Sequence, residues 1–565
     1  MTEHFDAVVV GSGFGGSVMA YRLAEAGLSV CVLERGKPYP PNSFPRSPHL
    51  MRRNFWDPSD GLHGMFDIWS FRGLEAVVSS GLGGGSLIYA NVLLRKDEKW
   101  FVREDTSKKG YEYWPVTRAD LDPHYNRAEQ MLGGQRYPFG HPPYNQTPKT
   151  GAMQYAAERL NASGTKVQWQ LPMLAVTFAN QGADPIPGEP IRETEPNLHE
   201  RTRYTCRLCG ECDVGCNYGA KNTLDYTYLS AAWRKGAEIR TLHEVRTFEP
   251  RPQGGYTVRY VRHSPEHEGH RHDTNKLEQH EVTCDRLVLS AGTLGTTYLL
   301  LRNRKAFPGL STRLGEQFCG NGDLLSFAMK CRNASGKGSG LMNPNLGPVI
   351  TSAIRVGDSL DSDGSNGRGF YVEDAGFPAF MSWILEASLV PGLLRRVLTF
   401  GWQRFRMAMS KHYDADMDAE LSALFGDTRL SSDSLPLLGM GRDMPDGKMT
   451  LSGEWLDVDW TTRNSREYFE RMRNVMKDMA RIWDGTFRDN LLWYLKRVIT
   501  VHPLGGCPMG ADVTQGVVNS YGEVFGHPGL YVADGSIMPG PVGPNPCLTI
   551  AALADRSADH IVEKH

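Results

Sequence analysis

The chain has 565 residues, of which 40% are hydrophobic, and its formal net charge is −2. This length and apolar content suffice for a large core and more than one folding unit, and the near-neutral charge argues against nucleic acid as a partner. A small molecule is the expected ligand. The chain enters an apolar strand without a basic and apolar leader, and it has no uncharged apolar run of about 18 residues or more. We therefore expect a cytoplasmic protein without a membrane span.

The amino-terminal segment has the pattern of a nucleotide-binding turn. The apolar run AVVV predicts a buried parallel strand, and GSGFGG follows it at once, before a helical pattern. Gly11 permits the tight turn, Gly13 lets the backbone approach a pyrophosphate, and Gly16 lets the helix and the strand pack closely. A second predicted strand ends at Glu34, where a carboxylate would accept hydrogen bonds from ribose hydroxyls. This pattern predicts a dinucleotide but does not decide between NAD and FAD.

A second glycine cluster, GLGGGSLIYAN at residues 81–91, is too rich in glycine for a helix interior or a central strand. We expect it to form a loop against a flat or phosphorylated group, which favours FAD. The apolar residues on both sides disfavour the alternative, a flexible linker.

Four cysteines stand close together in the run CRLCGECDVGC. Their spacing, C-x2-C-x2-C-x3-C, is that of a bacterial iron–sulfur ligand run, although Asn217 replaces the proline that usually follows the last cysteine. Zinc, a disulfide pair and simple packing are the alternatives; zinc normally takes two separated C-x2-C pairs, and disulfides are rare in the cytoplasm. The residues predicted to hold a cluster are Cys206, Cys209, Cys212 and Cys216.

Three segments of the middle region have weaker patterns. Residues 377–409 are apolar and basic, so they could lie on a membrane surface or form a helical pair over an apolar pocket. Residues 449–460 are expected to form a hairpin with the segment before the turn at 446–447. Apolar residues at helical spacing predict a helix over 464–483.

Together these elements resemble the glucose–methanol–choline (GMC) oxidoreductases, and among them the bacterial cholesterol-oxidase-like branch. Besides the amino-terminal glycines, the resemblance rests on GGGS from Gly83, WPVTRADLDPHYNRAEQMLG from Trp114, LVLSAGTLGT from Leu287, HPLGGCPMG from His502 and LYVADGSIMPGPVGPNPCLTIAALADR from Leu530. Membrane-linked sugar dehydrogenases of the same superfamily hold a 3Fe–4S cluster with a C-x5-C-x3-C run, which Cys206, Cys212 and Cys216 reproduce. Cys209 would then be an additional thiol, or the fourth ligand of a 4Fe–4S cluster.

The resemblance implies an α/β fold in which a Rossmann-like FAD-binding domain is interleaved with an α+β substrate domain of a sheet and helices. The implied FAD-binding domain comprises residues 1–95, 200–325 and 490–565, with the cysteine-rich segment 206–216, and the substrate domain comprises 96–199 and 326–489. The implied and expected FAD contacts are Gly11, Gly13, Gly16, Glu34, Gly84, Gly85, Ser86, Tyr89, Ala90, Asn91, Val245, Asp534, Gly535 and Cys547. Tyr89 stands where cholesterol oxidases have asparagine, and Cys547 where they have phenylalanine.

The resemblance also implies three catalytic residues, His502, Asn545 and Glu373. Oxidation of an alcohol needs a base for the hydroxyl proton while hydride leaves the carbon, and imidazole titrates near neutrality. Asparagine can orient the hydroxyl without changing its own charge. A glutamate held against apolar walls could move a proton during double-bond isomerisation, whereas the alternative for Glu373 is a strand-end carboxylate in solvent.

We therefore expect an FAD-dependent enzyme that oxidises an alcohol on a lipophilic, sterol- or terpenoid-like substrate, with His502 as the base. With a cluster, electrons would leave to a protein or quinone acceptor; without one, dioxygen would reoxidise the flavin. Two other classes stay open: a lyase in which FAD is structural, and an electron carrier or redox sensor without an alcohol substrate.

Overall fold

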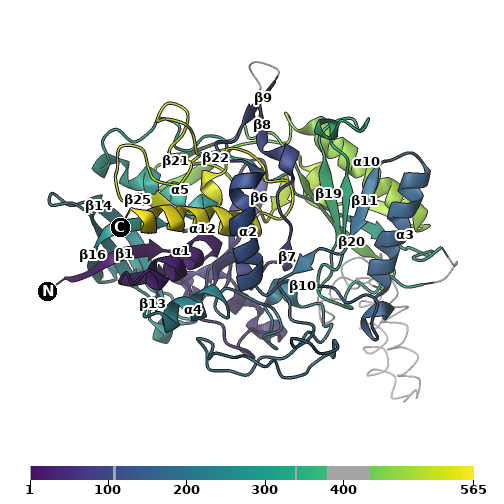
Figure 1. Ribbon diagram of the computed structural model, residues 1–565, viewed down its shortest axis with the longest axis horizontal. Coiled ribbons are helices and arrows are strands. Elements are labelled where there is room, and N and C mark those ends of the chain that lie inside the picture. The colour runs from purple at the N-terminus through teal and green to yellow at the C-terminus, as the bar shows by residue number, and fades with distance from the viewer. Residues whose placement is uncertain (1, 106–109, 337–339, 378–431, 565) are drawn as a thin grey trace, which may run out of the picture.

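Two main sheets form the centres of the molecule, as the computed structural model shows for residues 2–105, 110–336, 340–377 and 432–564 (Figure 1). The first sheet lies near both chain ends, and the second lies at the opposite end of the long axis. Among the described residues, no helix is long and apolar enough to cross a membrane. The apolar and basic stretch at 377–409 lies almost wholly outside the described residues.

The first sheet has seven strands, five of them parallel. The parallel strands are β13 (Glu238–Thr241), β2 (Val30–Glu34), β1 (Glu3–Val10), β16 (Gln279–Leu289) and β25 (Leu530–Val532), and the antiparallel strands β15 (Tyr256–Arg262) and β14 (His243–Pro250) extend the sheet beyond β16. The AVVV run is fully buried in β1, as expected for a parallel strand covered on both faces. The strands predicted at AVVV and SVCVLE are thus confirmed.

Helices from both ends of the chain cover this sheet. α1 (Phe14–Glu25) packs against α12 (Cys547–Glu563) and α4 (Tyr228–Arg234), and α12 packs against α2 (Arg118–Met131). Asp555 on α12 holds these helices together, because its carboxylate pairs with Arg22 of α1 and Arg127 of α2. α5 (Gly292–Asn303) contacts β14 and β21.

The second sheet is antiparallel and has six strands. Their order is β11 (Val167–Gln170), β18 (Ala353–Val356), β19 (Phe370–Asp374), β20 (Leu435–Gly441), β17 (Leu324–Met329) and β23 (Thr486–Asp489). α3 (Pro148–Ala162) and α10 (Arg466–Ile482) pack on this sheet (Figure 1). α10 confirms the helix predicted from apolar spacing, and the stripe of Phe469, Met472 and Met476 is buried.

The predicted hairpin pairing was wrong. β21 (Lys448–Ser452) pairs with β22 (Trp455–Asp459) in a sheet of their own, so the turn lies at Gly453 and not at 446–447. Gly453 has a left-handed φ of 62°, which suits a tight turn. Gly447 instead exchanges two backbone hydrogen bonds with Phe318.

Short strands complete the described fold. β24 (Val498–Thr500) pairs in parallel with β6 (Leu74–Ser79), which also pairs with β5 (Phe66–Ser70), and β24 ends just before His502. The others are β3 (Trp56–Asp57), β4 (Leu62–His63), β7 (Val92–Leu93), β8 (Val102–Asp105), β9 (Gly110–Tyr113), β10 (Gln135–Arg136) and β12 (Met173–Leu174), together with the short helix α11 (Leu491–Tyr494).

Candidate active site

The amino-terminal glycine turn lies between β1 and α1 as predicted. Gly11 has a φ of 95°, and a Cβ added there would lie 2.4 Å from the carbonyl oxygen of Ser290. A Cβ at Gly16 would lie 2.1 Å from the carbonyl oxygen of Gly11, so only glycine allows this close packing. A Cβ at Gly13 would meet nothing within 4 Å, and no side chain caps the α1 N-terminus. The turn therefore has open space and unpaired N–H groups for a pyrophosphate.

The second glycine cluster lies directly against this turn. A Cβ at Gly84 would stand 2.7 Å from Gly13 Cα, whereas one at Gly85 would meet nothing within 4 Å. Ser86 Oγ donates to Gly83 O at 2.7 Å and so stabilises the loop. Asn91 at the end of the cluster is fully buried, yet both polar atoms of its side chain lack a partner. Because buried amides are normally satisfied, these two atoms of Asn91 suit contacts with a bound ligand, and the two loops fit a dinucleotide.

The carboxylate of Glu34 is buried at the end of β2 and held by backbone. One oxygen accepts from Ser12 N at 3.0 Å, and the other accepts from Gly36 N at 2.8 Å. The ADG segment of the carboxy-terminal block reaches the same turn, since a Cβ at Gly15 would lie 1.5 Å from the carbonyl oxygen of Ala533. Asp534 and Gly535 therefore follow directly after a contact with the glycine turn.

The remaining predicted cofactor contacts lie on nearby elements. Tyr89 and Ala90 follow the second glycine loop, and the Tyr89 hydroxyl donates to Asn222 O at 3.1 Å. Cys547 begins α12, and its Sγ lies 3.3 Å from Val92 O. Val245 is buried in β14. Their contacts with FAD stay predictions.

His502 is oriented by a buried carboxylate. Its Nδ1 lies 2.9 Å from Asp323 Oδ1, and its backbone N–H donates to Asp323 Oδ2 at 3.2 Å. Asp323 is 1% exposed, and its Oδ2 also accepts from Val501 N at 2.8 Å. A proton on Nδ1 satisfies this carboxylate, which leaves Nε2 with a free lone pair.

Asn545 and Glu373 form a second pair. Asn545 Nδ2 donates to Glu373 Oε2 at 3.3 Å, while Asn545 Oδ1 and Glu373 Oε1 are buried without a partner. Glu373 is 0% exposed, so the alternative of a solvent-exposed strand-end carboxylate is wrong. Burial raises the pKa of Glu373 to about 8; the bond from Asn545 opposes this shift, and the neighbouring carboxylates of Asp374 and Asp323 add to it. The carboxyl is thus mainly protonated at neutral pH.

Asp323 is a site residue that the sequence did not predict. It lies 179 residues before His502 in the chain and belongs to no local motif. The only signal was an NGD triplet next to the apolar run of β17.

The cysteine run lies near the second glycine loop. Burial and then the thiols of Cys212, Cys209 and Cys216 raise the pKa of Cys206, so the four side chains are within electrostatic reach of one another. All ten cysteines are free thiols, so no disulfide pair occurs. Within the described residues, no three of these sulfur atoms all lie within 4.8 Å of one another. A Zn–S bond of about 2.3 Å requires sulfurs about 3.8 Å apart, so the run is not a preformed zinc site.

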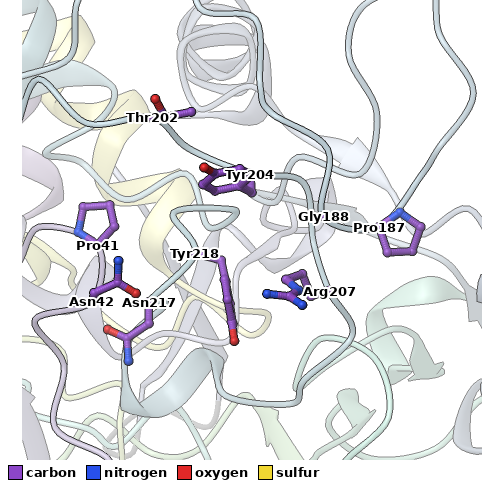
Figure 2. A pocket seen from close by; sticks show the side chains of 9 residues that line it. All are labelled: Pro41, Asn42, Pro187, Gly188, Thr202, Tyr204, Arg207, Asn217 and Tyr218. Atoms are coloured by element: carbon purple, nitrogen blue, oxygen red, sulfur yellow. The ribbon is translucent and has the colours of Figure 1, made fainter.

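A surface pocket of about 370 Å³ lies beside this run (Figure 2). Arg207 stacks on Tyr218, with 4.5 Å from its guanidinium carbon to the ring centre, and Asn42 and Asn217 line the other side. None of the three predicted catalytic residues lines this pocket.

Two regions of the chain match the family described as GMC oxidoreductase. Residues 5–304 match its amino-terminal part, and residues 442–554 match its carboxy-terminal part.

Curated relatives match over nearly the whole chain. A cholesterol oxidase of Mycobacterium tuberculosis is 30% identical over 99% of this chain and 91% of its own length. A cholesterol oxidase of Acinetobacter baumannii is 26% identical over 99% of this chain and 95% of its own length. A long-chain-alcohol oxidase of Arabidopsis thaliana is 23% identical over 99% of this chain and 67% of its own length.

Proposed function

The chain belongs to the GMC oxidoreductase family, and we propose that this FAD-binding enzyme oxidises the hydroxyl group of a lipophilic, sterol- or terpenoid-like alcohol. The observation that carries the proposal is the presence of two side-chain pairs, the partly buried His502 with Asp323 and the buried Asn545 with Glu373. The first pair has a free imidazole nitrogen, and the second has a free acceptor and a free carboxyl oxygen.

Bound FAD would supply the acceptor for the hydride that leaves the alcohol carbon. His502 takes the hydroxyl proton on Nε2, because Nδ1 is engaged by Asp323. The carboxylate of Asp323 then stabilises the imidazolium that forms and holds the ring in place, as the third member of a catalytic triad does.

Asn545 orients the substrate. One hydrogen of its Nδ2 is engaged by Glu373, so the second can donate a hydrogen bond to the hydroxyl oxygen while His502 takes the hydroxyl proton. Burial raises the pKa of Glu373 to about 8, so its ionised form is a stronger base than an ordinary carboxylate and can take a proton from one carbon of a product ketone and return it to another. We assign to Glu373 this later isomerisation step.

The names of these three relatives support a lipophilic substrate, since they refer to cholesterol and long-chain alcohols. The two sheets support the division into a Rossmann-like FAD-binding domain (1–95, 200–325, 490–565) and an interleaved substrate domain (96–199, 326–489). Asn545 would come from the first domain and Glu373 from the second, so the active site would lie between them.

A substrate test follows. Under anaerobic conditions, a 3β-hydroxysterol should bleach the flavin absorbance of the purified protein, whereas glucose should not, because the site proposed for a lipophilic substrate would leave sugar hydroxyls unpaired. Bleaching by glucose alone would refute the lipophilic assignment. Turnover without bleaching would indicate a lyase, and no response to any alcohol would indicate an electron carrier.

We further assign an iron–sulfur cluster to the cysteine run, and with it an exit for electrons to a protein or quinone acceptor in place of dioxygen. Lys221 connects this run to the second glycine loop, because its Nζ donates to Leu87 O at 3.0 Å and to Cys212 O at 2.7 Å. The free thiols within electrostatic reach of one another are a donor set that suits a cluster. The relatives that are named as oxidases favour dioxygen as the electron acceptor. Whether this enzyme uses dioxygen or a protein or quinone therefore depends on the presence of the cluster.

Wild-type protein purified without air should contain about three or four irons per chain. The Cys212→Ser variant should lose this iron and should no longer transfer electrons to a one-electron dye. Substrate should still bleach the flavin of this variant. Cys331→Ser is the matched control, since this buried cysteine lies outside the run. If iron-free protein retained full activity, the cysteine run would have only a packing role, and the enzyme would be an oxidase.

A further inference from the structure

One short loop, residues 319–323, contacts the segments that carry both His502 and Asn545. Cys319 and Leu504 exchange two backbone hydrogen bonds of 3.0 Å, and Thr500 Oγ1 lies 3.0 Å from Gly320 O. The loop is thereby fixed to the segment on both sides of His502. At the end of the same loop, Asp323 holds the imidazole itself.

The middle residue of this loop, Asn321, binds the segment that carries Asn545. Asn321 is 0% exposed, and its Oδ1 accepts from Gly543 N at 2.9 Å. Its Nδ2 donates to Pro544 O at 3.1 Å and lies 3.3 Å from Gly543 O. Both ends of one amide thus hold the two residues that precede Asn545. No part of the sequence signals this contact, which spans 222 residues of chain.

The far side of residues 541–544 is closed by other buried groups. Lys96 Nζ donates to Pro541 O at 2.7 Å and to Val542 O at 3.1 Å. The ring of Trp100 packs on Gly543 so closely that an added Cβ would lie 2.4 Å from it. Residues 541–544 are therefore held from two sides. On the side of the 319–323 loop, the side chain of Asn321 makes the hydrogen bonds to this segment.

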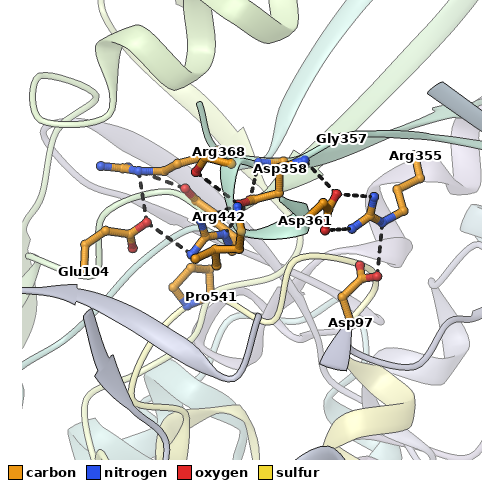
Figure 3. Close-up of polar contacts among 12 residues, drawn as sticks. Asp97, Glu104, Arg355, Gly357, Asp358, Asp361, Arg368, Arg442 and Pro541 are labelled. Carbon is orange, nitrogen blue, oxygen red and sulfur yellow. Dashed lines mark hydrogen bonds and ion pairs between the residues drawn. The ribbon is translucent and has the colours of Figure 1, made fainter. Parts of the chain in front are cut away.

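A network of buried charges lies at the end of β20 in the second sheet (Figure 3). Arg442, which follows β20, is 0% exposed, pairs with Asp358 at 2.9 Å and lies 3.3 Å from Glu104. The residue before it, Gly441, donates its N–H to Asn321 O at 2.9 Å. The backbone of Asn321 is thus held independently of its side chain, so the loop can keep its place when the amide is removed.

We propose that Asn321 is a positioning residue for Asn545, and that the 319–323 loop holds Asn545 and His502 as one unit through Asn321 and Asp323. The catalytic consequence rests on the proposed function, whereas the structural consequence does not. Catalysis is sensitive to such placement, since a shift of about 1 Å can cost about 100-fold in rate.

The test variant is Asn321→Gly. Asn321 has a φ of 53°, which glycine adopts without strain, so this variant removes the hydrogen bonds to Gly543 and Pro544 without forcing the backbone. The matched control is Asn303→Ala. Asn303 is also buried, and its amide also joins two backbone groups, accepting from Phe248 N at 3.2 Å and donating to Leu299 O at 2.8 Å.

The first measurement is hydrogen exchange of the holoenzyme, read by mass spectrometry on peptides that cover 540–547. Asn321→Gly should speed exchange there at least about 10-fold, because the Gly543 N–H loses its acceptor, and Asn303→Ala should leave that peptide unchanged. Unchanged exchange in Asn321→Gly would overturn the proposal, whatever the enzyme's substrate proves to be.

The second measurement is the limiting rate of anaerobic flavin reduction at saturating substrate. Asn321→Gly should lower it about 10-fold or more with flavin content retained, whereas Asn303→Ala should not lower it. Combined with Asn545→Ala, Asn321→Gly should cost little further, because both changes remove the same orienting group. A fully additive loss would show that Asn321 does not act through Asn545. An alcohol that fails to reduce even the wild-type flavin would refute the proposed function and leave the exchange result standing.

Discussion

Replacing His502 with alanine is expected to slow anaerobic flavin reduction about 100-fold or more while FAD stays bound, the usual scale for the loss of a general base. Nε2 of His502 is the only ring nitrogen left free, since Nδ1 pairs with Asp323 at 2.9 Å. Stopped-flow absorbance under anaerobic conditions measures the rate directly. His280→Ala is the control, because this ring stacks on Tyr260 in the first sheet, away from the proposed base.

The Asp323→Asn variant distinguishes two effects of Asp323 on His502: orientation of the imidazole ring, and stabilisation of the imidazolium by the negative charge. The amide oxygen can still accept from Nδ1, but no carboxylate remains to stabilise the imidazolium. We expect a loss of rate smaller than that of His502→Ala, because the ring keeps a hydrogen-bond acceptor at Nδ1 but the imidazolium that forms loses its neighbouring carboxylate. If His502→Ala left the reduction rate unchanged, the base would lie elsewhere, and Glu373 would be the next candidate.

Replacing Glu373 with glutamine should leave flavin reduction largely intact but stop the movement of a double bond. From a β,γ-unsaturated alcohol, the variant should accumulate the unshifted ketone, because glutamine cannot carry the proton between the two carbons. Product analysis by ultraviolet absorbance distinguishes the conjugated from the unconjugated ketone. A product mixture equal to that of the wild type would refute the role of Glu373 in isomerisation.

The same substitution should change how stability depends on pH. Burial raises the pKa of Glu373 from 4.5 to about 8. Between these values the unfolded chain has released this proton and the folded protein has kept it, so this group makes the free energy of unfolding fall as pH rises from about 4.5 to about 8. Glutamine has no such proton, so Glu373→Gln should gain stability over the wild type toward pH 8, by an amount on the order of a few kcal/mol. Thermal unfolding at pH 5 and pH 8 measures the difference.

Features that depend on neighbouring residues could be predicted from the sequence. The glycine turn was predictable because a left-handed φ at Gly11 and the close contact at Gly16 are demands of local backbone geometry. α10 was predictable because its apolar stripe repeats at helical spacing. His502 and Asn545 could be named because a long ordered block surrounds them, although the sequence alone did not show what holds either one.

Features that depend on distant residues were decided only in the tertiary structure. The hairpin turn lies at Gly453 and not at the predicted position, because Gly447 forms backbone hydrogen bonds with Phe318 instead. Glu373 could have been an exposed strand end, and only the packing of the second sheet excluded water from its carboxyl and raised its pKa.

The sequence by itself determined the nucleotide turn, the family resemblance and the chemical types at the active site, because each is written in residues that stand close together in the chain. The tertiary structure alone decided which groups orient them. Asp323 reaches His502 across 179 residues, and Asn321 reaches Gly543 across 222. Such contacts follow from where β17, β24 and the carboxy-terminal block meet, and no local propensity or spacing encodes that meeting.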